Sequence, residues 1–429
     1  TSIVHAYLNL YGYRGSISTC PDDMQVNAYM ITSDWNTSNV NENAPICLGS
    51  DGRANYSDIL DYVYCNDTEA EGGKLYEFEI TDAAQKWVEG PSPNYGIALR
   101  ASGLGSAESF ARFYDSTNLQ TSQACPKFIY VYRDSKGIED YWSFTSMDAG
   151  RTGVASVNNY NGNLVTVHDL VSSTGNNMPV NLSIIYSANS ADINGYSGLG
   201  MWRTNYHMKI ETCDLSFYDV NYNYCFVDSD GTRHYLKEEG AEHKDEDGLG
   251  LTLTVENASD YKYKMETKDH TEYLFDYFGR LIKITDRNGN FNFVKYASYS
   301  DSTVQRIIYI EEGCAATTER RRTNLALNET TGDVTVTSPE GRSVTLDFVS
   351  ASNKMLQGIH FADGVNTAFT FTQIGSGYFP SVIRDGSGHR TDITYPGGGS
   401  RRVASLKWGT DDETLQQYSF TYGHNHTKV

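Results

Sequence analysis

The stretch Gly279–Tyr296, GRLIKITDRNGNFNFVKY, decides the fold of this chain because its pattern recurs downstream. Each copy predicts a strand, a tight Asp-x-x-Gly turn and a second strand, with the alternation of a β-hairpin that buries one face. Weaker copies begin at residues 338, 361 and 412, so that the copies from 338 onward start 23–27 residues apart. One hairpin cannot bury its apolar face alone, so the repeats predict a stack or a continuous sheet. The positions shared by the two strongest copies are Asp286, Gly289, Val294 and Tyr296, matched by Asp385, Gly388, Ile393 and Tyr395.

The composition also indicates an all-β protein of more than one domain. The chain has 429 residues, enough for two or three cores, and combines 32 tyrosines with only 9 prolines. Polar and glycine residues interrupt the apolar runs at short intervals, as turns between strands do. The one convincing helix is Thr81–Gly90, where Thr81 can act as the N-cap and Gly90 can end the helix.

Residues 1–134 are predicted to form a separate β-sandwich, because they contain six runs that alternate apolar and polar residues. Trp87 and Val88 are expected to close one edge of its core, and residues 135–140 are expected to be a polar linker. The runs are residues 6–13, 25–32, 75–81, 94–101, 109–116 and 126–133.

The repeat pattern resembles the YD repeat of the RHS-repeat proteins, a family that includes teneurins and bacterial polymorphic toxins. The resemblance covers roughly residues 137–395, because dissimilar motifs occur in the family's order. It implies an RHS N-terminal β-region over 141–270, repeats over 271–429, and a β-sheet shell wound around a cargo polypeptide. The upstream motifs are YWSFT (141–145), NNYNGNLV (158–165), MPVNLSIIYSANS (178–190), GLGMWRTNYHMKI (198–210), DSDGTRHYLKEE (228–239) and DEDGLGLTLTVE (245–256).

The first module resembles the DNRLRE jelly-roll domains, which occur in front of RHS repeats in wall-associated bacterial proteins. The resemblance implies carbohydrate binding, although FYDS at 113–116 departs from the family pattern and leaves a site there in doubt. A sugar platform needs exposed aromatic faces beside polar groups. Trp35 and Tyr95 are therefore the candidate carbohydrate-binding residues, with core packing as the equal alternative, whereas Trp87 is expected to belong to the core. The motifs are DWN (34–36), FEITDAAQKWVEG (78–90), NYGIAL (94–99) and PKFIYVYR (126–133).

The net charge of −20 argues against nucleic acid as a partner, because phosphate binding needs clustered Lys and Arg. The basic runs 320–322 and 401–402 are interpreted as solvated loops or as partners of nearby carboxylates. No stretch is long and apolar enough to span a membrane, and the acidity suits a secreted or cell-surface protein.

Seven cysteines do not fix the redox state. Cys213 and Cys225 flank a strand pair, so a cross-strand disulfide and buried free thiols are equal alternatives. The absence of Cys-x-x-Cys argues against a structural zinc site. No cofactor is predicted. Structural calcium at the acidic turns 228–231 and 245–248 remains an alternative without a complete ligand pattern, and ordinary hairpin turns explain both better.

No nucleophile elbow, zinc-protease helix or P-loop occurs, so this segment is predicted not to be an enzyme. The leading hypothesis is a structural shell whose effector lies beyond Val429, with a first domain that contacts cell-wall or extracellular polysaccharide. The alternatives are a polysaccharide-binding adhesin without cargo and a polysaccharide-degrading enzyme. The repeat register further predicts that Gly→Val at Gly289 or Gly388 destabilises more than at Gly375.

Overall fold

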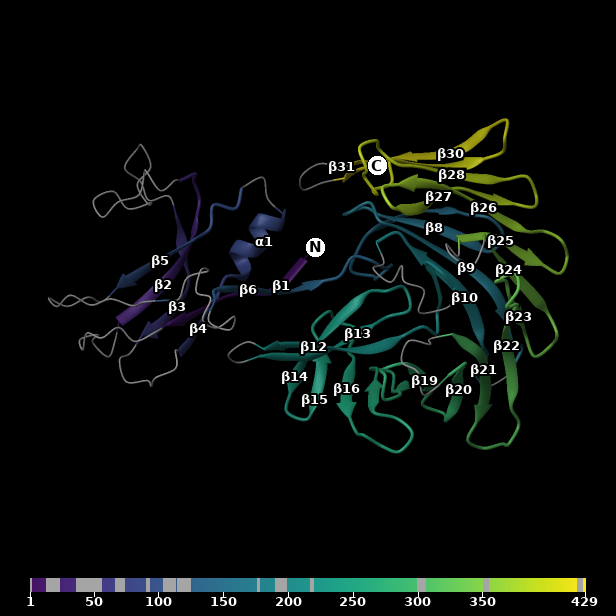
Figure 1. Cartoon of the computed structure of the whole chain (residues 1–429), viewed down its shortest axis with the longest axis horizontal. Coiled ribbons are helices and arrows are strands. Elements are labelled where there is room, and N and C mark those ends of the chain that lie inside the picture. The colour runs from purple at the N-terminus through teal and green to yellow at the C-terminus, as the bar shows by residue number, and fades with distance from the viewer. Residues whose placement is uncertain are drawn as a thin grey trace. The chain divides into compact units, whose positions relative to one another are not determined.

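The computed structural model describes most of the chain (Figure 1). It divides into two compact units, Thr1–Arg133 and Asp134–Val429, with residues 217–219 outside the described part. The described ranges are 2–12, 24–35, 56–65, 74–89, 93–102, 113, 125–175, 178–189, 199–216, 220–298, 306–349, 355–422 and 427–429. Strands dominate both units, which confirms the all-β fold class.

The first unit contains two three-stranded antiparallel sheets whose apolar faces share one core, and one helix, α1 (Thr81–Glu89). Ala6 of one sheet and Ala28 of the other are fully buried, as is Phe78. One sheet has the order β4 (Lys74–Glu79), β1 (Ser2–Gly12), β6 (Lys127–Arg133), and the other has the order β3 (Tyr56–Cys65), β2 (Met24–Ile31), β5 (Ile97–Ser102).

Three details of the first unit differ from the sequence prediction. Strand β3 was not expected, because its aspartates interrupt the apolar alternation, and the predicted run 109–116 lies outside the described residues except for Phe113. Thr81 was expected to cap the helix, but it is the first residue of α1, and its hydroxyl accepts a hydrogen bond from the Ala6 backbone N–H at 3.0 Å. Val88 is 42% exposed and does not close the core, whereas Trp87 packs against it.

The second unit is built on a 19-stranded antiparallel sheet in which every strand pairs with the next strand along the chain. In Figure 1 these strands follow one another in an arc from β14 to β30. Strands such as β24 alternate buried and partly exposed residues, so one face of the sheet carries the core. The strands are β12 (Lys209–Ser216), β13 (Asn221–Val227), β14 (Arg233–Glu239), β15 (Glu242–Asp245), β16 (Thr252–Val255), β17 (Tyr263–Glu266), β18 (Glu272–Phe275), β19 (Leu281–Thr285), β20 (Asn290–Tyr296), β21 (Ile307–Cys314), β22 (Arg321–Leu327), β23 (Val334–Thr337), β24 (Ser343–Val349), β25 (Met355–Phe361), β26 (Thr367–Ile374), β27 (Gly377–Asp385), β28 (Arg390–Thr394), β29 (Ser405–Gly409) and β30 (Thr414–Ser419). A short pair, β31 (Thr421–Tyr422) and β32 (Thr427–Lys428), follows.

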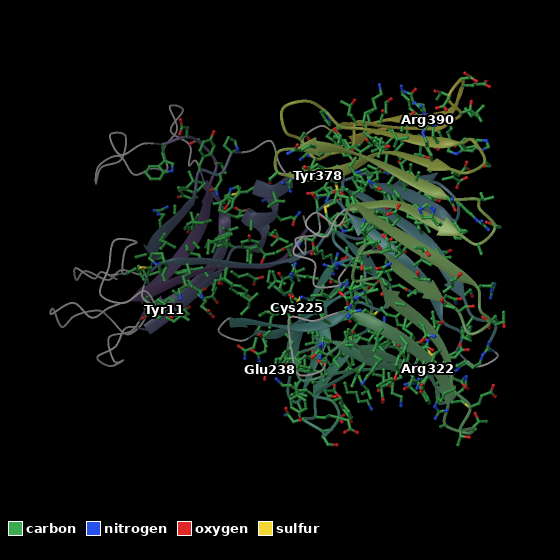
Figure 2. The ribbon with its side chains drawn as sticks, turned by 45° about the vertical axis from the view of Figure 1, so that its right-hand side comes forward. Tyr11, Cys225, Glu238, Arg322, Tyr378 and Arg390 are labelled. Atoms are coloured by element: carbon green, nitrogen blue, oxygen red, sulfur yellow. The ribbon has the colours of Figure 1, made fainter. Side chains whose placement is uncertain are left out.

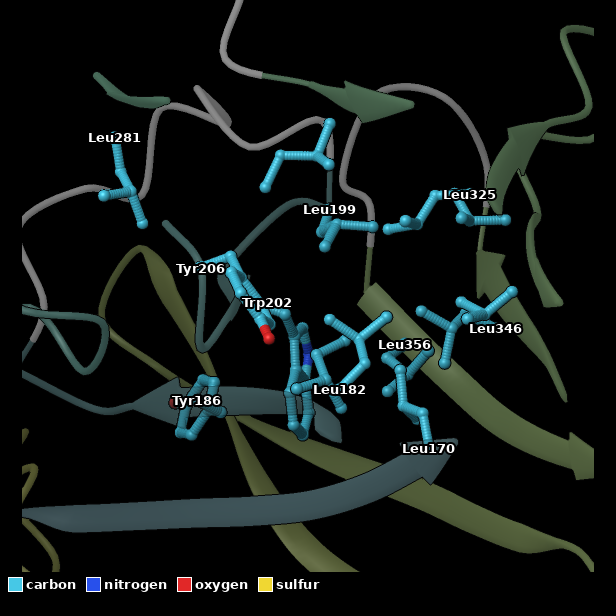
Figure 3. Close-up of a cluster of buried hydrophobic side chains, with 14 of the residues drawn as sticks. Leu170, Leu182, Tyr186, Leu199, Trp202, Tyr206, Leu281, Leu325, Leu346 and Leu356 are labelled. Carbon is cyan, nitrogen blue, oxygen red and sulfur yellow. The ribbon is translucent and has the colours of Figure 1, made fainter. Parts of the chain in front are cut away.

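A five-stranded sheet lies on the inner side of this arc (Figure 1). Its order is β11 (Trp202–Thr204), β10 (Asn181–Ser187), β9 (Leu164–Ser172), β8 (Gly153–Asn158), β7 (Phe144–Asp148). All residues of β10 after Asn181 are buried, so both faces of this strand are covered. Figure 3 shows Leu182 and Trp202 of this sheet beside Leu356 of the large sheet, within one continuous apolar core. The inner sheet therefore supplies the packing surface that the long sheet needs.

The long sheet also curls back on itself at its beginning. The backbone N–H of Ile210 donates to the Gly279 carbonyl at 2.8 Å, and that of Leu281 donates to the Met208 carbonyl at 3.1 Å. These bonds join the start of β12 to the start of β19. Strands β12–β19 therefore return to their own first strand before the rest of the sheet continues.

Residues 135–140, expected to be a linker, belong to the second unit. The Lys136 carbonyl accepts hydrogen bonds from the Asn163 amide and the Ser187 hydroxyl, both at 2.6 Å. The segment is anchored because buried Asn163 needs a partner for its amide. The backbone of this segment is thus held by side chains of the second unit.

Cys213, Cys225 and Cys314 are free thiols. A hydrogen bond with Cys213, burial and the nearby charge raise the pKa of Cys225 well above its usual value. Of the two alternatives for this pair, the structure has the thiols. Cys20, Cys47 and the side chain of Cys65 lie outside the described residues. Within the described chain, no helix reaches the length and apolar character that crossing a membrane would require.

Candidate functional site

The turn at Asp286 is organised by its carboxylate. Oδ1 accepts hydrogen bonds from the backbone N–H groups of Asn288 at 2.8 Å and Asn290 at 2.9 Å. Gly289 closes the turn with φ of +79°, a region that favours glycine. Desolvation opposes ionisation, but the hydrogen bonds from Asn290 and Asn288 outweigh it and hold the pKa of Asp286 below its usual value.

The turn at Asp385 has the same construction. Its Oδ1 accepts from the backbone N–H groups of Ser387 at 2.9 Å and His389 at 2.8 Å, and Gly388 has φ of +99°. The weaker copies at 338 and 361 keep the positive-φ glycine, at Gly341 and Gly364. Gly375 also has a positive φ, of +61°, so the expected contrast with Gly289 and Gly388 does not follow from backbone geometry.

The tyrosine of each strong copy ties the end of its hairpin to the beginning. The Tyr296 hydroxyl donates to the Leu281 carbonyl at 2.8 Å, and the Tyr395 hydroxyl donates to the Pro380 carbonyl at 2.9 Å. Both bonds span 15 residues, so the copies share a clasp as well as a turn. The aspartate and tyrosine of the repeat thus act at opposite ends of one hairpin.

Replacing Tyr296 by phenylalanine is expected to lower the free energy of unfolding by about 1–3 kcal/mol, because the buried Leu281 carbonyl loses its partner. Tyr277→Phe is the matched control. The Tyr277 hydroxyl also donates to a backbone carbonyl, that of Ala258 at 2.7 Å, but its side chain is exposed. Denaturant unfolding should leave the control within about 0.5 kcal/mol of the wild type. Equal losses in both variants would contradict the clasp.

The sequence analysis missed a third strong copy of the turn, at Asp276. Its Oδ1 accepts from the backbone N–H groups of Phe278 and Arg280, both at 2.9 Å, and Gly279 has φ of +78°. Arg280 is 1% exposed and pairs with Asp276 Oδ2 at 2.7 Å. The Asp-x-x-Gly spacing at 276–279 was the available signal. It stands directly before the stretch that revealed the repeat.

The basic run 320–322 pairs with carboxylates of a neighbouring strand. Arg322, labelled in Figure 2, lies 2.7 Å from Glu311, and Arg321 lies 3.4 Å from Glu312. Buried Glu312 also accepts the Ser173 hydroxyl at 2.6 Å, which joins β21 to the segment after β9. Glu312 therefore connects the long sheet to the segment after β9, and Arg321 balances its buried charge.

A buried histidine lies at the centre of the apolar core. His168 is fully buried, neither of its ring nitrogens has a hydrogen-bond partner, and its ring lies 5.1 Å from that of Phe369 and 5.9 Å from that of Trp202. Burial lowers its pKa to about 3, because the apolar surroundings disfavour the charged form.

We expect His168 to make folding sensitive to acid. The unfolded histidine takes up a proton near pH 6.5, whereas the folded one stays neutral to about pH 3. The free energy of unfolding is therefore unaffected by this residue above pH 6.5 and decreases as the pH falls below it. The loss is about 1.4 kcal/mol per pH unit below 6.5. His168→Leu should flatten the decline measured by urea unfolding between pH 6.5 and 4.5. Exposed His270→Leu should not, and an unchanged slope in His168→Leu would contradict the assignment.

In the first unit the structure brings Trp35 and Tyr95 together. The Trp35 indole N–H donates to the Tyr95 carbonyl at 2.7 Å, and Trp35 as a whole is 38% exposed. Neither residue lines the groove of about 590 Å³ beside α1. The polar residues lining that groove are Thr32, Ser57, Asp58, Glu79, Thr81, Asp82 and Lys86.

The two acidic turns have the backbone of ordinary hairpin turns. In the first, the Gly231 N–H donates to the Asp228 carbonyl at 3.0 Å. In the second, Asp245 Oδ2 accepts from the Leu249 N–H at 2.8 Å. One aspartate of each turn nevertheless lies beside the same histidine. His234 lies near Asp228 of the first turn and is hydrogen-bonded to Asp247 of the second.

No family model matches this chain, and no curated protein matches it significantly. Two solved structures are similar over part of it. A crystal structure of TcdB2-TccC3-TEV has 9% identity over 61% of this chain and 18% of that chain, with a TM-score of 0.21. A Photorhabdus luminescens Tc holotoxin pore with a mutated TccC3 has 9% identity over 64% of this chain and 22% of that chain, with a TM-score of 0.20. The matched region thus spans about a fifth of those chains, and likeness this low does not establish a shared fold.

Proposed function

We propose that the second unit is a non-catalytic scaffold, the opening segment of an RHS-type β-sheet shell that encloses an effector continuing beyond Val429. The observation that carries the proposal is the uninterrupted 19-stranded sheet in which each strand pairs with its sequence neighbour. Repeated turns and tyrosine clasps give the sheet a hairpin unit, and a further hairpin of the same kind can pair with the last strand. A wall of this kind needs no catalytic residue.

The inner sheet supports this proposal because it explains how such a shell begins. A long sheet with one apolar face must cover that face. Here β8–β10 cover it, and β12–β19 curl back on their first strand. Further hairpins after β30 would extend the sheet past the inner sheet of this segment. Their inner face would then be open to cover another polypeptide.

For the first unit we propose contact with a cell-wall or extracellular polysaccharide, in a secreted or surface-attached protein. The half-exposed Trp35 ring, held by its hydrogen bond to Tyr95, supports this, because sugars stack on aromatic faces beside polar groups. A polysaccharide-binding adhesin without cargo is the second candidate, favoured by the same residue. Trp35→Ala should abolish the retention of the protein on polysaccharide columns. Unchanged retention of the variant would contradict a role of the Trp35 ring in sugar binding.

Protease protection tests the shell. The naturally occurring full-length protein is treated with a broad-specificity protease, beside the downstream polypeptide produced alone. The proposal expects the downstream polypeptide to resist cleavage only within the full-length protein. Digestion at equal rates, with the repeat sheet still intact, would contradict encapsulation and favour the adhesin.

A further inference from the structure

A cluster of polar residues at the start of the second unit remains without a role in the proposed shell. Glu139 comes from the segment before β7, Asp228 from the turn after β13, and His234 from β14. Ligand atoms of these three side chains all lie within 4.8 Å of one another. Segments far apart in the sequence thus present two carboxylates and one imidazole to a common point.

The histidine is oriented as metal-binding histidines are. His234 is fully buried, and its Nδ1 lies 2.9 Å from Asp247 Oδ2, which fixes the ring. Its Nε2 lies 3.3 Å from Glu139 Oε1, so this buried nitrogen is directed into the cluster and faces one of its carboxylates. A carboxylate on the far nitrogen of a histidine is the usual outer support of a metal ligand.

The cluster also has an excess of negative charge. The carboxylates of Glu139 and Asp228 gather around the single imidazole of His234, and Asp247 lies on its other ring nitrogen. Asp230 itself is engaged elsewhere: Oδ1 accepts from Thr232 at 2.9 Å and Oδ2 accepts from the Ile138 N–H at 2.9 Å. Asp230 therefore shapes the site, while Glu139 and Asp228 keep oxygens for a ligand.

We propose that Glu139, Asp228 and His234 bind a divalent cation of the zinc type, with Asp247 as a positioning residue. One imidazole nitrogen and two carboxylate oxygens form a three-residue set that zinc accepts, with water completing the coordination. Calcium is disfavoured, because it requires six to eight oxygen ligands and the set contains a nitrogen. The bound ion would cross-link the segment before β7 to the β13–β14 hairpin.

A proton on His234 is the competing way to balance these charges. His234 lies 2.9 Å from Asp247 and 3.3 Å from Glu139, so a proton on the imidazole and a bound cation are alternative counter-charges for the same carboxylates. Only the neutral imidazole is a metal ligand, so the two exclude each other.

The test is calorimetric titration of zinc into the chelator-treated full chain. We expect one saturable site, with affinity lowered at least tenfold by Glu139→Gln or Asp228→Asn and about 10–100-fold by Asp247→Asn. Glu139→Gln is isosteric and is expected to fold, so the test remains valid if the His234→Gln variant does not fold. Cobalt in place of zinc should give a visible absorption band that disappears in His234→Gln.

Two matched controls separate this site from other zinc ligands. His270→Ala removes an exposed histidine that lies 2.7 Å from Glu266, and Cys213→Ser removes the partner of Cys225. Both controls should keep the affinity of the wild type. Absence of saturable binding, affinity unchanged in Glu139→Gln, loss in Cys213→Ser, or calcium binding as tightly as zinc would each overturn the proposal.

Discussion

Replacing Asp276 with alanine is expected to destabilise the second unit by about 3–5 kcal/mol, because it leaves the buried Arg280 guanidinium without its counter-charge. Asp276 Oδ2 accepts from Arg280 Nε at 2.8 Å, and the other oxygen holds two backbone N–H groups of the turn. The guanidinium also packs over the Tyr296 ring, with its central carbon 4.8 Å from the ring centre. Aspartate removal thus affects the turn and the clasp together.

Asp411→Ala is the control for this prediction. Asp411 pairs with Arg384 and with Arg390, each at 2.8 Å, but its side chain is 63% exposed. An exposed ion pair contributes about 0–1 kcal/mol, so the control should unfold almost as the wild type does. The double variant Asp276→Asn with Arg280→Met should recover part of the loss, because it removes the buried charge. Similar losses for Asp276→Ala and Asp411→Ala would contradict the buried pair.

Substituting Gly279 with alanine is expected to cost on the order of 2–5 kcal/mol, from a positive φ and from a clash. A Cβ at this position would lie 2.0 Å from the Ile210 carbonyl oxygen, which is backbone and cannot rotate away. This is the point where β12 meets β19. The substitution should therefore open the curled part of the sheet as well as strain the turn.

Gly388→Ala separates the two causes. Gly388 occupies the same turn position with φ of +99°, and a Cβ there would meet nothing within 4 Å. Its substitution should cost only the conformational part, about 1–2 kcal/mol. Gly397→Ala, in open space without a positive φ, should be nearly neutral. The hydrogen-exchange rates of the β12 and β19 amides should rise in Gly279→Ala alone. An equal rise in Gly388→Ala would contradict the pairing of β12 with β19.

The sequence predicted what depends on local pattern. The turns at Asp286 and Asp385 repeat at fixed spacing, and alternation along each strand indicates a sheet with one buried face. The helix at Thr81–Glu89 was recognisable from its end signals, although the Thr81 hydroxyl serves β1 instead of the helix. Strand β3 was not predicted, because Asp58 and Asp61 interrupt its apolar residues.

Long-range pairing could not be predicted in this way. Nothing in the local pattern shows that Ile210 meets Gly279, or that Glu139 and His234 share one site. The sequence identified the acidic turns as candidate oxygen ligands but could not place a buried histidine between them. In the first unit, Trp35 and Tyr95 were chosen separately by resemblance, and the structure adds the hydrogen bond between them.

Electron cryo-microscopy of the naturally occurring full-length protein tests the central claim most directly. The shell account predicts that antiparallel hairpins continue the sheet after β30 and that the closed wall surrounds density for a further stretch of polypeptide. A sheet that stops at β30, with this edge open to solvent and nothing enclosed, would contradict it.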